Sequence, residues 1–307
     1  MRVRCRPIQP FNKEAADDLI QKDHGLHPDD KYLKPGRIPH IWCPGCGLGV
    51  VVTTFIEAIH RKGLPIDKCA VVSGIGCTGR VAGYLDMDTY HTTHGRAIPF
   101  ATGLALARPD TTVTVFSGDG DLFAIGGNHL IHAARRNVNL KVICVNNFNF
   151  GMTGGQAAPT TPLEAKTSTT PTGNAEPAFN LPYLAHAAGA IYVARWTTFH
   201  PRQLVHSISE TLDKKGFTFV EAIAPCPTGF GRPNKLGSGL DEMRFYRDNS
   251  EIRNGANPSE AIVELRGKLV VGTFVNTDRP DFIQNYNSNV VSRVVGKADG
   301  QGKGRAA

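Results

Sequence analysis

The stretch VTVFSGDGDLFAIGGNHLIHAARRNVNLKVICVNNFNFGMTGG (residues 113–155) contains two short apolar runs separated by glycine-rich and periodic segments. Residues 113–116 and 140–145 are β-branched and apolar, which is typical of buried parallel strands. Asp121 is placed to cap a helix between them. The apolar residues of this helix recur at near-helical spacing: Leu122, Ile125, Leu130, Ile131 and Ala134. The pattern predicts a strand–helix–strand unit.

The two predicted strand ends carry the polar groups of a ligand site, because ligands of open α/β sheets bind at the carboxyl ends of the strands. Asp119 offers a carboxylate, Asn147 offers an amide oxygen 28 positions later, and Asn149 offers a backbone carbonyl. Such oxygen ligands suit Mg²⁺, which usually shares its coordination with phosphates. Gly118 and Gly120 let the backbone approach closely, and a helix N-terminus points N–H groups at an anion. The sequence therefore predicts a site for a metal-bound diphosphate.

At these residues the sequence resembles the diphosphate-binding domain of thiamine diphosphate enzymes, whose motif joins GDG to a later NN. A lone GDG is typical of a surface turn. Here both ends of the motif, their spacing and the strand–helix–strand context agree. Asp121 is expected to cap the helix rather than to bind metal.

The rest of the chain continues the alternation of helices and strands. Residues 152–180 are rich in Thr, Pro, Gly and Ala, and a structureless loop of that length is usually functional. We expect helices at 47–62, 94–108, 182–188 and 201–215, and strands at 69–73, 190–194 and 217–223. After residue 236 we expect one helix near 258–268, and disorder over 296–307.

The predicted fold class is α/β: a doubly wound, mainly parallel sheet of the thiamine-diphosphate-binding type. We assign it to a domain spanning residues 41–235. An irregular, proline-punctuated arm (1–40), with a helical turn at 15–21, precedes this domain, and a C-terminal extension (236–307) follows it.

Four of the seven cysteines are candidate metal ligands. Cys43 and Cys46 form CPGC ahead of a helix, Cys77 follows a strand in GIGC, and Cys226 follows the last strong strand. Four thiolates from separated segments suit a [4Fe–4S] cluster or a structural Cys₄ zinc site, and a CxxC pair also suits a redox disulfide. The remaining cysteines are expected to be core thiols or to lie in the arm: Cys144, Cys69 and Cys5.

The order CPGCG, GIGC, HGR, GDGDL, NN, GMTGGQ and a late cysteine resembles the β-subunits of 2-oxoacid:ferredoxin oxidoreductases, over about residues 38–235. Phe150 departs from the family, which often has Tyr there. The resemblance implies bound thiamine diphosphate, Mg²⁺ held by Asp119, Asn147 and Asn149, and one [4Fe–4S] cluster held by Cys43, Cys46, Cys77 and Cys226. It implies that the cofactor is lined by Ile75, Gly76, Cys77, Thr78, His94, Gly118, Asp119, Gly120, Gly151, Met152 and Thr153.

A competing motif lies at residues 74–79, GIGCTG, which is literally the GxGxxG dinucleotide fingerprint. No good helix follows it, and no acidic residue ends a second strand at the expected distance. Cys77 inside the turn is also unusual for that role. We therefore consider a nicotinamide dinucleotide site disfavoured.

Composition narrows the cellular setting. The 41% hydrophobic and 20% charged content is that of an ordinary globular protein, and no apolar segment is long enough to span a membrane. The net charge of +7 is scattered and lacks an aromatic–basic motif, so we expect no nucleic acid partner. No signal peptide is evident, so we expect a cytoplasmic protein with reduced cysteines.

The resemblance implies CoA-dependent oxidative decarboxylation of a 2-oxoacid, or its reverse, with electrons passing through the cluster to ferredoxin. It also implies an α-subunit that supplies the pyrimidine-binding domain and an activating glutamate, in an (αβ)₂ assembly. In similar enzymes a cation at the place of Arg80 accompanies use of 2-oxoglutarate, giving succinyl-CoA. We assign catalytic roles to Arg80 and His94. Alternatives are pyruvate or branched-chain 2-oxoacids, a non-redox enzyme with structural zinc, and a non-catalytic anion sensor.

Overall fold

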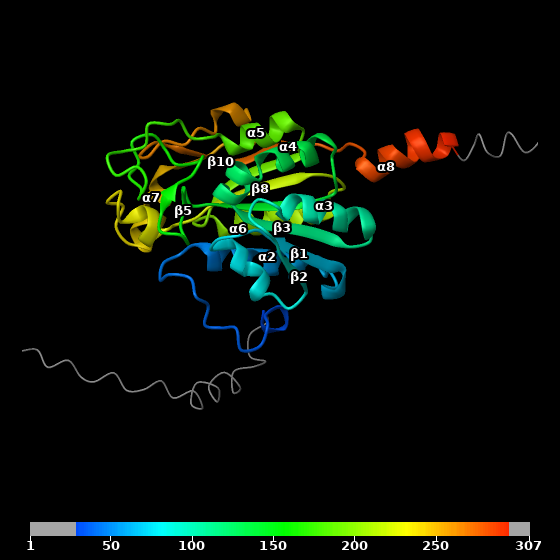
Figure 1. The fold of residues 1–307 in the computed structure, drawn as a ribbon, viewed down its shortest axis with the longest axis horizontal. Helices are drawn as coiled ribbons and strands as arrows, with labels where there is room; N and C mark the ends of the chain where they lie inside the picture. Colours follow the sequence, from blue (N-terminus) through cyan, green and yellow to red (C-terminus); the bar gives the residue numbers. More distant parts are fainter. Residues whose placement is uncertain (1–28, 295–307) are drawn as a thin grey trace, which may run out of the picture.

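Eight strands form one sheet in the computed structural model, which describes residues 29–294. Their order is β2-β1-β3-β4-β8-β7-β10-β9, and every neighbouring pair is parallel except β7 with β10. The predicted mainly parallel α/β sheet is therefore confirmed (Figure 1). The strands are β1 (Cys69–Ser73), β2 (Asp88–His91), β3 (Thr112–Gly118), β4 (Lys141–Asn146), β7 (Tyr192–Thr197), β8 (Thr218–Ile223), β9 (Ser250–Ile252) and β10 (Leu269–Asn276).

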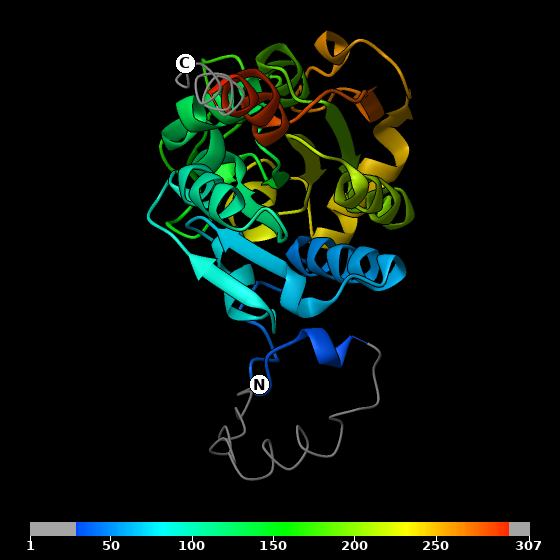
Figure 2. The same cartoon turned by 90° about the vertical axis from the view of Figure 1, so that its right-hand side faces the viewer.

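Helices cover both faces of the sheet, so the sheet has a buried core on each side (Figure 2). One core contains Phe55 and Leu204, and the other contains Ile98, Leu130 and Leu181. The first is covered by α2 (Leu48–Lys62) and α6 (Pro201–Asp213), and the second by α3 (Ala97–Ala107), α4 (Gly127–Arg135) and α5 (Leu181–Ala188). This two-faced burial explains why β4, β7 and β8 are buried along their whole length.

The central unit places the predicted ligands at one edge. β3 and β4 pair in parallel with Gly118 opposite Val145, so GDG and NN both follow strand ends at the carboxyl edge. The intervening helix is divided, because a π-helical turn (Gly120–Ile125) precedes α4. The Gly126 amide donates to the carbonyl of Asp121 at 3.0 Å, and a Cβ at Gly126 would lie 2.8 Å from that oxygen. Glycine therefore permits the break.

The segment after residue 236 differs from its prediction. No long helix forms near 258–268: Pro258–Glu260 is a single 3₁₀ turn. Instead the segment supplies α7 (Gly239–Asn249), β9, β10 and α8 (Phe282–Tyr286), with β10 inserted between β7 and β9. A small hairpin, β5 (Asn149–Phe150) with β6 (Gln156–Ala157), begins the long loop 152–180. The expectations for residues 15–21 and 296–307 lie outside the described residues, and the domain boundaries at 40 and 235 remain predictions.

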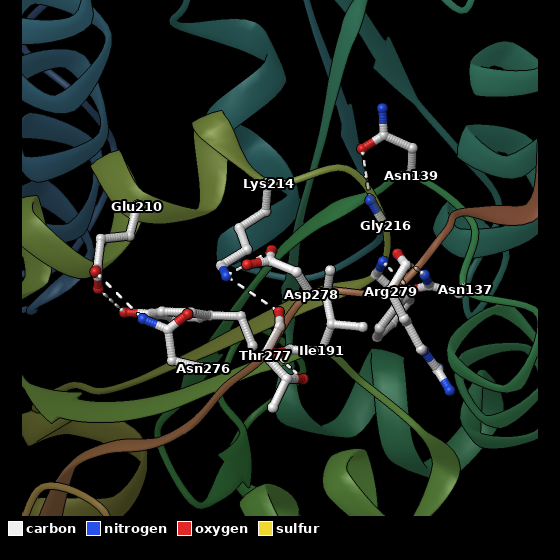
Figure 3. Close-up of polar contacts among 12 residues, drawn as sticks. Asn137, Asn139, Ile191, Glu210, Lys214, Gly216, Asn276, Thr277, Asp278 and Arg279 are labelled. Carbon is white, nitrogen blue, oxygen red and sulfur yellow. Dashed lines mark hydrogen bonds and ion pairs between the residues drawn. The ribbon is translucent and has the colours of Figure 1, made fainter. Parts of the chain in front are cut away.

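Hydrogen bonds attach the chain after β10 to the edge where the parallel strands begin (Figure 3). Lys214 Nζ donates to the carbonyl of Thr277 at 3.1 Å and pairs with Asp278 at 2.9 Å. The Asn137 side chain accepts from the amide of Phe217 at 2.9 Å and donates to the carbonyl of Pro280 at 3.0 Å. The end of the described chain is thus fastened far from the carboxyl edge. Within residues 29–294 we find no helix that is long and apolar enough to cross a membrane.

Candidate active site

A pocket of about 90 Å³ opens at the carboxyl edge of β1, β3 and β4. Four segments that are distant in sequence meet there. They contribute Ile75, Gly76, Cys77, Thr78, His94, Gly118, Asp119, Gly120, Asp121, Asn147, Asn149, Phe150, Gly151, Met152 and Thr153. Every residue that the sequence predicted to line the cofactor is in this set. The structure therefore brings the predicted cofactor residues together in one place.

Three oxygen-bearing groups converge inside this pocket. The side-chain nitrogen of Asn147 donates to the backbone oxygen of Asn149 at 2.8 Å and to Oδ1 of Asp119 at 3.3 Å. Turning the amide over would point its oxygen at these two atoms instead. A cation among the three oxygens would satisfy them equally well, and octahedral Mg²⁺ at 2.0–2.1 Å from each ligand sets neighbouring oxygens roughly 3 Å apart. The donor set thus fits a small hard cation.

Asp119 is a buried carboxyl group whose pKa is raised to about 7. Burial is the main cause, and a hydrogen bond from Thr160 opposes it. The Thr160 hydroxyl donates to Oδ2 of Asp119, which leaves Oδ1 facing Asn147. A buried carboxylate of this kind is stabilised by a bound cation, which replaces the proton.

Asp121 does not cap the helix start, so that prediction is wrong. Its Oδ2 accepts from the Ser117 hydroxyl at 2.6 Å, and its Oδ1 accepts from the amides of Ile75 and Gly95 at 3.2 Å and 2.8 Å. The carboxylate lies inside the π-helical turn and points back across the sheet edge. Asp121 therefore connects three segments that border the pocket: the loop after β1, the turn before α3 and the end of β3.

His94 lines the pocket beside this carboxylate. Its Nδ1 lies 2.5 Å from Oδ1 of Asp121, and its ring meets the ring of Phe150 edge-on at 6.1 Å between centroids. The side chain is 34% exposed, so one side of the ring faces the opening. Its catalytic role remains a prediction, although its place in the pocket agrees with that role.

Phe150 packs against Gly120. A Cβ at Gly120 would lie 2.7 Å from Cζ of the Phe150 ring, so the ring occupies the space that a side chain in the GDG turn would need. Glycine at this position lets the loop after β4 close over the turn after β3. The hydroxyl that a Tyr would carry at position 150 is missing, and the ring edge borders the pocket instead.

The four candidate cluster cysteines are neighbours. The pKa of the Cys46 thiol is raised to about 12, mainly by burial and in smaller part by the nearby thiols of Cys226, Cys77 and Cys43. The pKa of Cys77 is likewise raised, first by burial and then by Cys226 and Cys43. Within residues 29–294, no group of three or more His, Cys, Asp or Glu side chains has the geometry of a metal site. The thiols share one region, and their role as cluster ligands remains a prediction.

The other two cysteines of the described chain lie apart from these four. Cys144 is fully buried in β4, where desolvation raises its pKa well above the ordinary value, and Cys69 begins β1. Burial also raises the pKa of Cys69 to about 11. Both behave as core thiols, as the sequence predicted.

Arg80 lies in the 3₁₀ turn Thr78–Gly83, one turn beyond Cys77. It is exposed, and its charge lowers the pKa of Cys77 against the larger effect of burial. Arg80 does not itself line the pocket in this structure. Its role in substrate binding is therefore untested. The 3₁₀ turn also replaces the helix that a dinucleotide fingerprint at residues 74–79 would need.

Two functional residues escaped the sequence analysis. Thr160 and Thr161 belong to the long loop and contact the ligand-bearing segments. Nothing in their local sequence marks them, because the loop has no periodicity and the contacts span 41 and 13 positions. The length of the loop was the only signal that pointed to function.

Comparison with known proteins agrees with this geometry. Residues 61–222 match the family model described as thiamine pyrophosphate enzyme, C-terminal TPP binding domain. The chain is 51% identical over 263 residues to the 2-oxoglutarate synthase subunit KorB of Methanocaldococcus jannaschii, covering 85% of this chain and 97% of that protein. It is 55% identical over 222 residues to the KorB subunit of Archaeoglobus fulgidus, covering 72% and 83%.

A solved structure is similar as well. It is the 2-oxoglutarate:ferredoxin oxidoreductase from Magnetococcus marinus with 2-oxoglutarate, coenzyme A and succinyl-CoA bound. The match has a TM-score of 0.77 at 33% identity and covers 89% of this chain and 92% of that chain.

Fold, site and family model together define the class, a thiamine-diphosphate-binding subunit. Its relatives narrow the class further. The chain belongs to the β-subunits of the 2-oxoacid:ferredoxin oxidoreductases, in the group of the 2-oxoglutarate synthase KorB subunits.

Proposed function

We propose that this chain, as such a β-subunit, carries out the CoA-dependent oxidative decarboxylation of 2-oxoglutarate to succinyl-CoA and CO₂, or the reverse carboxylation. The observation that carries the proposal is the single pocket in which the segments around Ile75, His94, Asp119 and Asn147 meet. Identity of 51% to a KorB subunit over 85% of the chain supports the choice of 2-oxoglutarate.

Thiamine diphosphate, when bound, supplies the carbanion chemistry that decarboxylation of a 2-oxoacid requires. The chain's part is to hold it. Asp119, Asn147 and the Asn149 carbonyl would bind Mg²⁺, because the Asn147 side-chain amide already lies within 3.3 Å of both Asp119 Oδ1 and the Asn149 oxygen. Gly118 and Gly120 keep side chains away from the diphosphate. Ile75, Gly76, Cys77, Thr78, Gly151, Met152 and Thr153 would form the walls around the cofactor.

The [4Fe–4S] cluster would be bound by Cys43, Cys46, Cys77 and Cys226. Cys77 also lines the cofactor pocket, so it is the thiol nearest to the site of decarboxylation. Cys226 approaches the other side of the pocket loop, with Sγ 4.0 Å from the Asn149 side chain. These four cysteines would hold the cluster beside the pocket, and the chemistry that it would supply when bound is one-electron transfer to ferredoxin.

Substrate recognition would involve Arg80 and His94. His94 lies beside Asp121 and lines the pocket, where a ring N–H could donate a hydrogen bond to the oxygen of the reacting carbonyl. Arg80 lies one turn beyond Cys77, and a guanidinium that reached the substrate from there could bind the distal carboxylate of 2-oxoglutarate in a bidentate manner. Pyruvate and branched-chain 2-oxoacids have no such carboxylate, which is why we favour 2-oxoglutarate.

The proposal includes partners. An α-subunit would supply the pyrimidine-binding domain and its activating glutamate, in an (αβ)₂ assembly, and coenzyme A and ferredoxin would be the acyl and electron acceptors. We place the enzyme in the cytoplasm, because the six cysteines within residues 29–294 are all free thiols. The net charge of +7 is compatible with an acidic electron carrier.

The decisive test uses the αβ complex purified without oxygen. We expect a broad visible absorption that dithionite bleaches, and CoA-dependent reduction of ferredoxin with 2-oxoglutarate. A colourless complex that contains zinc and no iron would support the non-redox alternative and overturn the electron-transfer role.

A further inference from the structure

Two adjacent threonines of the long loop each contact one of the two segments that carry the oxygen ligands. The Thr160 hydroxyl donates to Oδ2 of Asp119, just after β3. The Thr161 hydroxyl donates to the carbonyl of Phe148, just after β4, at 2.6 Å. Both threonines are 1% exposed. One dipeptide therefore bridges the two strand ends on which the site is built.

The Thr160 contact selects which carboxylate oxygen is available. Because Oδ2 of Asp119 is occupied by the hydroxyl, Oδ1 is the oxygen that faces the Asn147 amide. Without the hydroxyl, the carboxylate could rotate about its Cβ–Cγ bond, and its oxygens would no longer be distinguished.

The Thr161 contact fixes the turn that carries the other ligands. Phe148 lies between Asn147 and Asn149 and has a left-handed backbone with φ of 63°. Such a conformation is unfavourable for a bulky residue and persists only when its surroundings hold it. Hydrogen bonds hold the peptide groups on both sides of Phe148: its amide donates to Asn146 Oδ1 at 3.1 Å, and its carbonyl accepts from Thr161.

The threonines are themselves held in place. The Thr161 hydroxyl accepts from the amide of Ala158 at 2.8 Å while it donates to Phe148, so it is held from both sides. The Asn174 side chain donates to the carbonyls of Thr161 and Glu176, each at 2.8 Å. These bonds close the loop on itself before it contacts the site. The loop therefore holds both threonines by its own hydrogen bonds.

We propose that Thr160 and Thr161 are positioning residues of the metal–diphosphate site, and that the long loop serves to place them. The inference rests on the proposed binding of Mg²⁺ by Asp119, Asn147 and Asn149. Neither threonine is a metal ligand in this scheme. Thr160 orients the Asp119 ligand by a direct hydrogen bond, and Thr161 orients the turn that carries Asn147 and Asn149 by a hydrogen bond to its backbone. Removal of outer partners of this kind commonly weakens metal binding.

The test is a Mg²⁺ titration of the αβ complex after removal of metal, at saturating thiamine diphosphate, followed by calorimetry. Thr160→Val keeps the shape of the side chain and removes its hydroxyl, and we expect Mg²⁺ to bind about 10- to 100-fold more weakly. Thr160→Ser should restore most of the affinity, because it returns the donor. Thr161→Val should also weaken binding.

The matched control is Thr167→Val in the same loop. Thr167 is equally buried, but its hydroxyl bonds only to Thr169 and Thr170, so its loss should lower the melting temperature and leave the Mg²⁺ affinity unchanged. Unchanged Mg²⁺ affinity in Thr160→Val, alongside lost affinity in Asp119→Ala, would overturn the positioning role and leave the proposed function standing. Unchanged affinity in Asp119→Ala as well would overturn the site itself.

Discussion

Gly45, in the turn between Cys43 and Cys46, packs directly on Gly239, the first residue of α7. A Cβ on Gly45 would lie 3.1 Å from the Cα of Gly239, and a Cβ on Gly239 would overlap the Gly45 peptide. Ser238 and Asp241 form a capping box that fixes where α7 begins. The start of α7 thus packs against the CPGC turn, so the segment after residue 236 helps to shape the candidate cluster site.

Gly239→Ala should therefore damage the cluster site while leaving thiamine diphosphate binding intact. The added methyl group displaces the Cys43–Cys46 turn, and overpacking of this kind costs about 1–3 kcal/mol. Iron content and visible absorbance per complex measure the effect. The control is Gly103→Ala in α3, where nothing lies within 4 Å of the added Cβ and helix stability should improve. Equal iron loss in both variants would contradict the prediction.

Asp119→Ala and Asn147→Ala should each abolish Mg²⁺-dependent retention of thiamine diphosphate, because each removes an oxygen from the converging set. The fold should survive, as judged by circular dichroism. In the wild type, burial raises the pKa of Asp119 to about 7, so Mg²⁺ must displace a proton below that pH. Mg²⁺ affinity should therefore rise as the pH rises through about 7. A flat profile would show that Asp119 is not the group that loses the proton.

Serine at Cys77 or Cys226 should lower iron content and visible absorbance. Serine at Cys144 should not lower the iron content, since that thiol is buried inside β4, apart from the four candidate cluster cysteines. Cys5→Ser, outside the described residues, should also have no effect on iron. Iron loss from Cys5→Ser equal to that from Cys77→Ser would show that a different set of thiols binds the cluster.

Arg80→Met should raise the KM for 2-oxoglutarate far more than the KM for 2-oxobutyrate. The difference should correspond to about 1.5–3 kcal/mol of binding free energy if a charged hydrogen bond is lost. Only the first substrate has a distal carboxylate for the guanidinium to bind. Steady-state kinetics of the complex with both substrates give the comparison. Equal effects on the two would assign Arg80 to the cofactor or to the fold.

Lys141, which lies far from the candidate active site, should make the stability of the fold depend on pH. It is buried at the start of β4, where it donates to Asn139 and to the carbonyl of Lys214, and desolvation lowers its pKa to about 7. In the unfolded chain the pKa is the ordinary 10.5, so between these values the unfolded state binds the extra proton. The free energy of unfolding should therefore gain a contribution that grows as the pH rises above about 7.

Urea unfolding of the wild type and of Lys141→Met at several pH values isolates this contribution, because the other titrating groups are common to both proteins. The difference between the two free energies of unfolding should change across that window. A constant difference would mean that Lys141 keeps its proton when folded.

The sequence was sufficient for the parts of the fold that carry local periodicity. The strand at residues 69–73 matches β1, and the helix at 47–62 matches α2, which Gly63 ends in a left-handed conformation as a helix stop should. The sequence also indicated that Asp119 and Asn147 lie close together, because parallel strands order their carboxyl ends along one edge and the spacing of the two residues follows from one strand–helix–strand unit.

The failures have a common physical cause, which is dependence on distant partners. β2 is a half-exposed edge strand, and β10 contains Gly272 and an irregular register against β7, so neither has a strong local pattern. Asp121 looked like a cap because it begins a helical segment, yet two of its partners lie 46 and 26 positions away. Contacts of this kind leave no periodic trace in the sequence.

The insertion of β10 next to β7 has a consequence for biosynthesis. β7 is buried along its whole length, yet one of its edges stays unpaired until residues 269–276 have left the ribosome. A strand with an open edge is a template for pairing with other chains. Nascent chains that stall before residue 269 are therefore the ones expected to aggregate, and chaperone protection matters most in the interval between the completion of β8 and the arrival of β10.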